Sequence, residues 1–232
     1  MTDASVRIGL MGDSIASGLG VRSERYIELV CAEEQYALAD FSRTGSTLRQ
    51  SWQRYLEYTG PSLDVMIIAH GITEPIPRPT TASMRFLPQR WRRLGWMDPR
   101  PYYSSKLRRR ALERLESALR WRVKNLLIRN QGFEVLEELP AYASIVRQVF
   151  DKLEDDQVRI IILEPTAIDE AFFPSASERQ MTYWNAARAV AGHRAVETRR
   201  HLHEWDDYLA DHFHPNRAGH AKLADLILAE LR

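Results

Sequence analysis

The sequence predicts an α/β fold in which helices cover both faces of a parallel sheet. Three observations favour it. Short apolar runs recur along the chain, segments of helical periodicity separate them, and some runs are apolar throughout, as in strands buried on both faces. The chain has 232 residues, enough for one large domain, and no linker or internal repeat divides it. We therefore expect a single domain over residues 1–232.

Three strands and two helices are expected in the first part of the chain. Val6–Leu10 is an apolar run that ends at a glycine-flanked turn, so it predicts the first strand. The helix Ser23–Gln35 follows, because its apolar residues share one side. Tyr36–Phe41 predicts the second strand and Leu48–Tyr58 the second helix. Asp64–His70 is continuously apolar in its interior, which indicates a buried third strand.

The last hundred residues return to the same alternation. The expected helices are Leu136–Leu153, Ser177–Ala191 and Arg217–Leu231, the last of which begins after a Pro-Asn pair. Val158–Glu164 is a buried strand that Pro165 stops. One more strand is expected between Arg194 and Trp205, although no pattern defines its bounds.

Composition excludes several classes of protein. Hydrophobic residues make up 44% of the chain and charged residues 27%, while the net charge is only +1, so the total charge favours no particular partner. The single cysteine, Cys31, excludes an intrachain disulfide and a cysteine-based zinc site. The first residues do not resemble a signal peptide, and no run approaches a membrane-spanning length. We expect a cytoplasmic protein without a bound metal or cofactor.

A basic, aromatic segment at about residues 76–130 interrupts the alternation of strands and helices. Between Arg78 and Arg129 there are 15 lysines and arginines but only three acidic residues, whereas the rest of the chain is acidic. The segment also holds three tryptophans and two tyrosines. Its first part is proline-rich and loop-like, and Ser105–Ile128 is expected to form one long helix. We interpret it as an insertion within the single domain.

Ser14 is the first candidate catalytic residue. It lies in the sequence Gly12-Asp13-Ser14, directly after the first expected strand. A turn at this point places a side chain at the carboxyl edge of a parallel sheet, where ligands bind. A serine there is a candidate nucleophile, and its backbone N–H would face the attacked atom. The alternative is that Asp13 and Ser14 only cap the next helix.

His214 and Asp211 are the candidate partners of Ser14. They lie three residues apart in a turn before the last helix, so Asp211 can orient the imidazole while its other nitrogen faces Ser14. The alternative is a surface turn that is merely rich in His and Asp. His212 and His220 are nearby competitors, and we prefer His214 because Pro215 and the helix after it restrict its position.

Two further turns are expected at the same edge of the sheet. Gly45 follows the second strand and would let a backbone N–H approach an oxyanion, although an ordinary turn glycine would look the same. Gly71, Thr73 and Glu74 follow the third strand, so we expect Asp13, Gly71 and Glu74 to contact substrate. A solvated loop is the alternative.

Taken together, these blocks resemble the SGNH, or GDSL, superfamily of esterases and lipases. The resemblance covers Gly12-Asp13-Ser14, Gly45 and Asp211-x-x-His214-Pro215, which together span nearly the whole chain. It implies a three-layer α/β/α, flavodoxin-like sandwich with about five parallel strands. It also implies a triad of Ser14, His214 and Asp211, with the N–H groups of Ser14 and Gly45 in the oxyanion hole.

The third block departs from this family. The usual Gly-x-Asn-Asp is replaced by Gly71-Ile72-Thr73-Glu74, so Thr73 stands where an asparagine side chain would donate to the oxyanion. Losing one such donor commonly costs about 100- to 1000-fold in rate, so we expect either that Thr73 substitutes as a shorter donor, that another group or a water does so, or that activity on simple esters is weak. The modified block and the proline-, tryptophan- and arginine-rich stretch after it are similar to the mycobacterial diglucosylglycerate octanoyltransferase branch.

Three functions follow as hypotheses. The first is a serine ester hydrolase that forms an acyl-enzyme on Ser14 and acts on a small acyl or carbohydrate ester. The second is an acyltransferase whose basic insertion holds acyl-CoA, an acyl carrier protein or an anionic lipid headgroup, and whose aromatic residues and leucines roof an acyl pocket. The alternative for the insertion is a solvated helix whose charges pair with the acidic remainder. The third is a non-catalytic binding protein. Nucleic acid is not expected as a partner.

Overall fold

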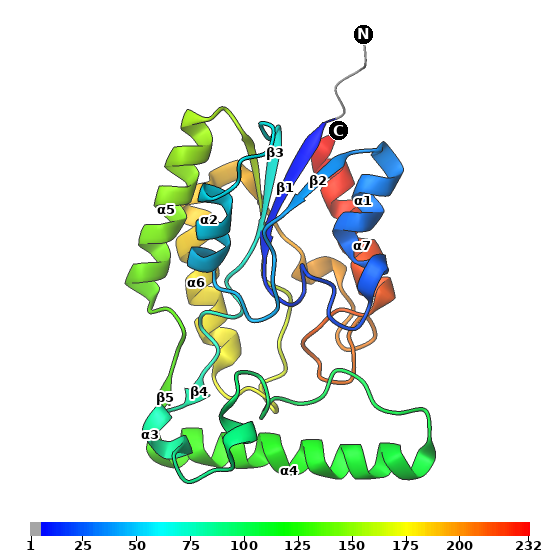
Figure 1. Cartoon of the computed structure of the whole chain (residues 1–232), viewed down its shortest axis with the longest axis vertical. Coiled ribbons are helices and arrows are strands. Elements are labelled where there is room, and N and C mark those ends of the chain that lie inside the picture. The colour runs from blue at the N-terminus through cyan, green and yellow to red at the C-terminus, as the bar shows by residue number, and fades with distance from the viewer. Residues whose placement is uncertain (1–5) are drawn as a thin grey trace.

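Five parallel strands form the central sheet in the computed structural model, which describes residues 6–232 (Figure 1). The strands, in the order in which they lie side by side, are β2 (Ala37–Asp40), β1 (Arg7–Gly12), β3 (Val65–Ala69), β6 (Arg159–Leu163) and β7 (Ala195–Val196). The predicted α/β fold with about five parallel strands is confirmed. The strand expected after Arg194 is β7, which pairs with β6 through two residues only, too short a run for a sequence pattern to define.

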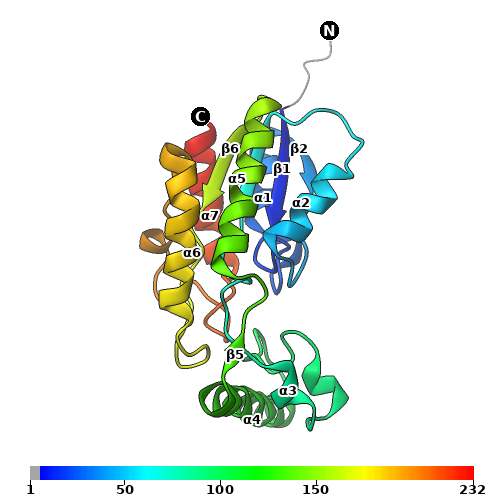
Figure 2. The same cartoon turned by 90° about the vertical axis from the view of Figure 1, so that its left-hand side faces the viewer.

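Helices cover both faces of this sheet and give three layers (Figures 1 and 2). α1 (Tyr26–Glu34) and α7 (Arg217–Leu231) pack together on one face. α2 (Leu48–Leu56), α5 (Leu139–Asp155) and α6 (Ala176–Ala191) cover the other. Each expected helix is present within a few residues of its predicted bounds, and α5 starts three residues late because Pro140 occupies its first turn.

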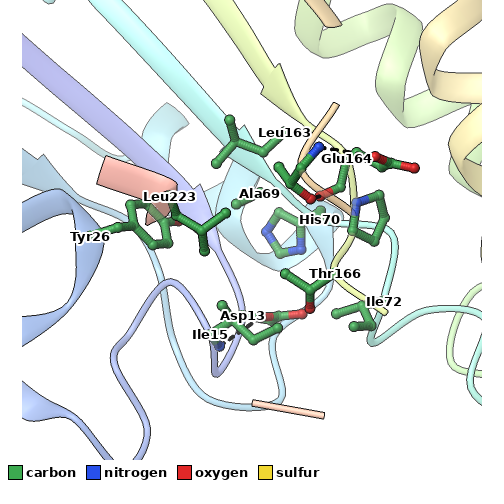
Figure 3. Close-up of a pocket in the computed structure, with 12 residues that line it drawn as sticks. Asp13, Ile15, Tyr26, Ala69, His70, Ile72, Leu163, Glu164, Thr166 and Leu223 are labelled. Atoms are coloured by element: carbon green, nitrogen blue, oxygen red, sulfur yellow. Dashed lines mark hydrogen bonds between the residues drawn. The ribbon is translucent and has the colours of Figure 1, made fainter. Parts of the chain in front are cut away.

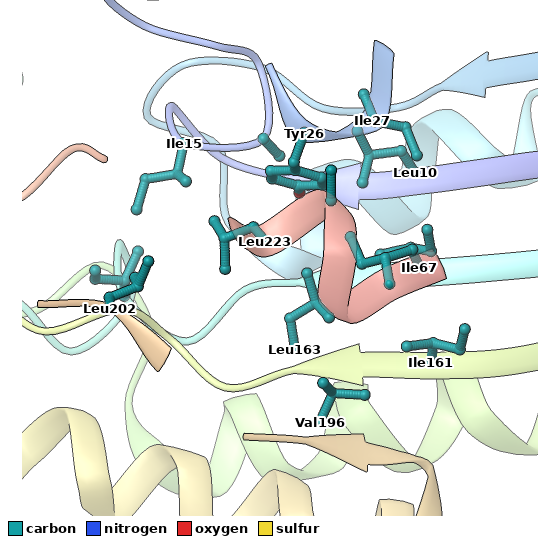
Figure 4. Close-up of a cluster of buried hydrophobic side chains, with 14 of the residues drawn as sticks. Leu10, Ile15, Tyr26, Ile27, Ile67, Ile161, Leu163, Val196, Leu202 and Leu223 are labelled. Atoms are coloured by element: carbon teal, nitrogen blue, oxygen red, sulfur yellow. The ribbon is translucent and has the colours of Figure 1, made fainter. Parts of the chain in front are cut away.

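Alternate residues of the inner strands supply the two cores between the layers. Along β6, Ile161 and Leu163 belong to the cluster beneath α1 and α7 (Figure 4), whereas Ile160 and Ile162 belong to the cluster beneath α2, α5 and α6. Successive side chains of a strand point to opposite faces. An inner strand that is covered on both faces must therefore be apolar at every position, which is why β3 and β6 were recognisable from their sequences.

The inserted segment lies at the base of the molecule, facing the carboxyl ends of the strands (Figures 1 and 2). It contains β4 (Arg78–Pro79), the short helix α3 (Thr81–Met84), the long helix α4 (Leu107–Gln131) and β5 (Phe133–Glu134). β4 and β5 pair antiparallel, so the segment leaves and rejoins the α/β sandwich at neighbouring points. α4 runs across the base and is close to the predicted helix, Ser105–Ile128.

No helix within residues 6–232 is both long and apolar enough to span a bilayer. The expectation that the N-terminus is not a signal peptide concerns residues that lie mostly outside the described range. The cytoplasmic location therefore stays a prediction.

Candidate active site

Ser14, His214 and Asp211 meet at the carboxyl edge of the sheet. The Ser14 Oγ lies 2.8 Å from Nε2 of His214, although 200 residues separate them in the sequence. On the other side of the ring, Nδ1 lies 2.6 Å from Oδ2 of Asp211. All three side chains are buried. The remaining oxygen of Asp211 accepts the backbone N–H groups of Phe213 and His214, so this carboxylate both orients the ring and is itself held in place.

A hydrogen-bonded turn after β1 positions Ser14. The N–H of Ser17 donates to the carbonyl of Asp13, and that of Leu19 donates to the carbonyl of Ser14. The Arg25 guanidinium ties the same turn to the sheet, because it donates both to the carbonyl of Ala16 and to the carboxylate of Asp40. α1 begins only at residue 26, so Ser14 lies well before this helix and does not cap it.

Contacts on both sides of His214 hold the loop before α7. The N–H of Leu209 donates to the carbonyl of His214 at 2.7 Å. Asn216 caps α7 by accepting the N–H of Gly219, and its amide group donates to the carbonyls of Asp206 and Tyr208. The Pro-Asn pair that suggested His214 from the sequence is therefore part of the structure that positions it.

The competing histidines have partners of their own. His212 Nδ1 lies 2.7 Å from Oδ2 of Asp169, and its ring stacks on Trp205. His220 is fully buried and accepts the N–H of Tyr26. Burial, followed by the nearby charge of His214, lowers the pKa of His220 to about 4. Among the described residues no cluster of three or more His, Cys, Asp or Glu side chains is arranged to hold a metal ion.

Two backbone N–H groups are available next to the Ser14 hydroxyl. Neither the N–H of Ser14 nor that of Gly45 donates a hydrogen bond within residues 6–232, and both residues line the same pocket. Gly45 has a φ of 74°, a left-handed conformation that residues with a side chain rarely adopt. Two such donors can stabilise the negative charge of a tetrahedral intermediate.

Thr73 also reaches this pocket, but its hydroxyl proton is engaged elsewhere. Its Oγ1 donates to Oδ2 of Asp13 at 2.8 Å, and the other Asp13 oxygen accepts the N–H of Ile15. Burial is the main influence on Asp13 and raises the pKa of its carboxyl group. A threonine hydroxyl has only one proton to give. In this geometry it is therefore not available to an oxyanion, contrary to the role predicted from the sequence.

Asp13, Gly71 and Glu74, for which the sequence predicted substrate contacts, do not line the pocket next to Ser14. Glu74 is fully buried, and its carboxylate accepts the N–H groups of Leu48 and Gly71. Burial opposes its charge, but His70 and the Leu48 N–H outweigh burial and lower the pKa of Glu74. It thereby joins the start of α2 to the loop after β3, a structural contact that no sequence pattern indicated.

The pocket beside the triad has a volume of about 590 Å³ and is lined on one side by the inserted segment. The sequence suggested that aromatic residues and leucines of the insertion roof an acyl pocket, but it did not indicate which ones. The lining residues of the segment are Ile76, Arg78, Arg93, Leu94, Gly95, Trp96, Asp98, Pro99, Pro101 and Tyr102. The one available signal was that the segment starts directly after the third loop of the site. Its aromatic and apolar side chains form a wall that faces Ser14.

A partly buried ion pair anchors this wall to α4. Lys124 Nζ lies 2.7 Å from Oδ1 of Asp98 and 4.0 Å above the ring of Phe173. Burial favours the neutral form of Asp98, but Lys124, Arg78 and His214 outweigh it and lower its pKa. The Asp98 carboxylate therefore places a negative charge at the pocket wall.

A second, much smaller cavity lies behind the nucleophile turn (Figure 3). Its volume is about 30 Å³, and its lining includes Asp13, His70 and Thr166. This space suits a water molecule and is too small for an ester. The 590 Å³ pocket is therefore the candidate substrate site.

Comparisons with known proteins support the fold. No protein-family model matches the sequence, and no curated protein sequence matches it. Solved structures do. The α/β hydrolase LAE5 from the metagenome of Lake Arreo, Spain, has a TM-score of 0.60 at 18% identity, covering 97% of this chain and 94% of its own.

Two esterases also align over similar lengths. The acetylxylan esterase Axe2 from Geobacillus stearothermophilus has a TM-score of 0.59 at 18% identity, covering 100% of this chain and 96% of its own. The psychrotrophic esterase EstA from Pseudoalteromonas sp. has a TM-score of 0.55 at 13% identity, covering 98% and 97%. At these identities the structural similarity establishes the fold only. The chemistry has to be inferred from the geometry of the site.

Proposed function

We propose that this protein is a serine ester hydrolase of the SGNH type. The observation that carries the proposal is the unbroken chain from the Ser14 Oγ to His214 Nε2 at 2.8 Å and from His214 Nδ1 to Asp211 at 2.6 Å. A serine hydroxyl is a weak nucleophile near neutral pH unless a base takes its proton. His214 is within reach to do so, and Asp211 stabilises the imidazolium that forms.

The reaction proceeds in two halves. Ser14 Oγ attacks the ester carbonyl carbon while its proton passes to His214, and the N–H groups of Ser14 and Gly45 bind the oxyanion. His214 then protonates the leaving alcohol as the ester bond breaks, which leaves an acyl group on Ser14. Water, deprotonated by His214, attacks this acyl-enzyme and releases the carboxylic acid and the free serine.

We propose that the substrate is an ester of a small acyl group or of a carbohydrate. A pocket of about 590 Å³ holds a ligand of this size. A structural neighbour supports this choice, since Axe2 is an acetylxylan esterase. Two further structures are of catalytic mutants of Axe2, in which a serine or an aspartate is replaced by alanine.

Acyl transfer is the second candidate function, and the wall made by the inserted segment favours it. A wall on one side of the pocket restricts the access of water to an acyl-enzyme, so that a sugar or another hydroxyl can compete as acceptor. Acyl-CoA, an acyl carrier protein or an anionic lipid is the candidate donor. Incubation with acyl-CoA and a series of sugars separates the two: an acylated sugar supports transfer, and hydrolysis that no acceptor alters supports the esterase.

Labelling of the nucleophile tests the proposal directly. A fluorophosphonate probe is expected to modify Ser14 alone, as located by mass spectrometry of the peptides, and Ser14→Ala is expected to abolish labelling. The same variant should lower the turnover of p-nitrophenyl acetate by at least about 1000-fold. Ser105→Ala, an exposed serine in the inserted segment, is the matched control and should keep both properties.

A pair of histidine variants completes the test. His214→Ala is expected to remove nearly all turnover, whereas His212→Asn should retain it, because His212 bonds to Asp169 and not to Ser14. Labelling at another serine, or equal loss of activity in both histidine variants, would contradict the assigned triad.

A further inference from the structure

The long helix α4 has its polar side chains on the buried face and its leucines on the exposed face. The buried residues are Ser117, Arg120, Lys124, Asn125 and Ile128. By contrast, Leu112, Leu115, Leu119 and Leu126 are 68%, 69%, 58% and 58% exposed. A helix on the surface of a globular protein ordinarily has the reverse arrangement. These four leucines of α4 therefore do not roof the pocket, whereas Leu94, Trp96 and Tyr102 of the same segment line it.

Specific polar contacts hold α4 in this orientation. The Arg120 guanidinium donates to the carbonyl of Trp96 at 2.8 Å, and the Asn125 amide donates to the carbonyl of Ala171 at 3.2 Å. Lys124 is paired with Asp98 at 2.7 Å. Turning the leucines inward would break these contacts and leave buried charges unpaired, which is strongly unfavourable.

The exposed leucines form one continuous stripe. Their positions, 112, 115, 119 and 126, are separated by three, four and seven residues, so they fall on the same side of an α-helix. α4 crosses the base of the molecule, and Figures 1 and 2 show no element beyond its outer side. Phe86 in the same segment is also 82% exposed.

The inserted segment also carries uncompensated positive charge. Eight exposed arginines of the segment make no ion pair with an acidic side chain anywhere in residues 6–232. They are Arg85, Arg90, Arg92, Arg93, Arg108, Arg114, Arg122 and Arg129. The acids that do pair with the segment's basic groups, Asp98, Glu113 and Glu116, belong to the segment itself. The acidic remainder of the chain therefore leaves this charge uncompensated, contrary to one of the hypotheses from the sequence.

We propose that the outer face of α4 docks on a lipid surface that carries anionic headgroups. An interfacial helix places an apolar stripe at the boundary of the acyl chains and its basic residues among the headgroups, as this helix is built to do. Arg108 and Arg122 lie beside the leucines on the helix surface. A second copy of the chain suits the face less well, because joining two leucine stripes would bring like charges together.

Vesicle sedimentation tests the proposal. The full chain is expected to sediment with vesicles of phosphatidylcholine containing about one third phosphatidylglycerol, and to do so at least about tenfold less with phosphatidylcholine alone or at high salt. Leu115→Glu with Leu119→Glu should weaken sedimentation by about tenfold or more. Arg108→Gln with Arg122→Gln should weaken it by about 30-fold, if each arginine contributes about 1 kcal/mol.

Matched controls separate docking from folding and from catalysis. Leu56→Glu, on α2 and away from α4, replaces a leucine of similar exposure (57%) and should leave sedimentation unchanged. Circular dichroism melts of each variant should match the wild type, since the changed side chains are exposed. Ser14→Ala should sediment like the wild type, so a failure of the proposed ester chemistry leaves this result intact.

Three outcomes would overturn the proposal. The first is sedimentation that is absent, indifferent to phosphatidylglycerol, or equally weakened by Leu56→Glu. The second is a dimer in analytical ultracentrifugation that the leucine variant converts to a monomer, which would assign the stripe to a second copy. The third is salt-sensitive binding to an acidic acyl carrier protein without binding to vesicles.

Discussion

The hydroxyl of Thr73 has one proton and two candidate acceptors. One is the Asp13 carboxylate at 2.8 Å, and the other is the oxyanion that would form above Ser14. Asp13 is buried, and its only other hydrogen-bond donor within the described residues is the N–H of Ile15. Because an unsatisfied buried carboxylate is costly, we expect the proton to stay with Asp13 and two backbone N–H groups to serve the oxyanion.

Thr73→Val distinguishes the two acceptors. Removing the hydroxyl should lower the free energy of unfolding by about 1–3 kcal/mol, since a charged group loses a donor, while kcat for a short ester falls less than tenfold. Urea denaturation and p-nitrophenyl acetate kinetics measure both quantities. A fall in kcat of about 100-fold or more, with stability unchanged, would instead place Thr73 in the oxyanion hole.

On the scale of helices and strands, α1 and α7 are joined by a contact that depends on protonation. The Tyr26 N–H at the start of α1 has no acceptor within its own helix, and His220 of α7 accepts it through Nδ1 at 3.2 Å. The two rings also stack, with centroids 5.7 Å apart. A proton on Nδ1 would replace this attraction by a repulsion between two donors.

His220 should make stability depend on pH. Its pKa in the folded protein is about 4, below the 6.5 of an ordinary histidine, so only the unfolded chain takes up this proton between those values. Folding stability is therefore complete above pH 6.5 and falls as the pH falls, by roughly 2–3 kcal/mol on reaching pH 4.5.

Urea denaturation at a series of pH values provides the measurement. His220→Gln keeps an acceptor for the Tyr26 N–H but cannot be protonated. Between pH 7 and 4.5 the free energy of unfolding of this variant should therefore fall by roughly 2–3 kcal/mol less than that of the wild type. Parallel curves for the two proteins would show that His220 titrates normally in the folded state.

On the scale of the whole molecule, the two ends of the inserted segment pair with each other, β4 with β5, while α4 contacts the sandwich through Lys124 and Asn125. Pro79 lies opposite Phe133 in this pair, so the two ends of the segment are adjacent. Neither of the two hydrophobic cores contains a residue between 80 and 132. The segment therefore contributes a wall of the pocket and the base of the molecule without contributing to the cores of the α/β sandwich.

Replacing residues 80–132 by Asn-Gly, a two-residue hairpin turn, should leave a protein that folds. We expect a cooperative thermal transition and intact fluorophosphonate labelling of Ser14. We also expect a KM for short esters raised by about tenfold, because Leu94, Trp96 and Tyr102 no longer line the pocket. An unfolded product would make the segment part of the folding unit, and an unchanged KM would show that its wall does not contact substrate.

Periodicity by itself determined the sandwich and the order of its parts. An inner strand of a covered sheet must be apolar over its buried length, as β3 is throughout and β6 is over residues 160–163, and a helix on such a sheet must repeat its apolar residues every three or four positions. The same local signals placed Ser14 at the end of β1 and His214 just before α7. The bounds of β7 could not be predicted in this way, because a strand of two residues is too short to show a period.

Only the tertiary structure decided which side chains meet. It selected His214 over His212 and His220, engaged the proton of Thr73 with Asp13, and withdrew Glu74 from the pocket to join α2 to the loop after β3. It also turned the leucines of α4 outward, because Asp98 and the carbonyls of Trp96 and Ala171 bind the polar face. Each of these outcomes is a competition between partners far apart in the sequence, and distance in space decides it.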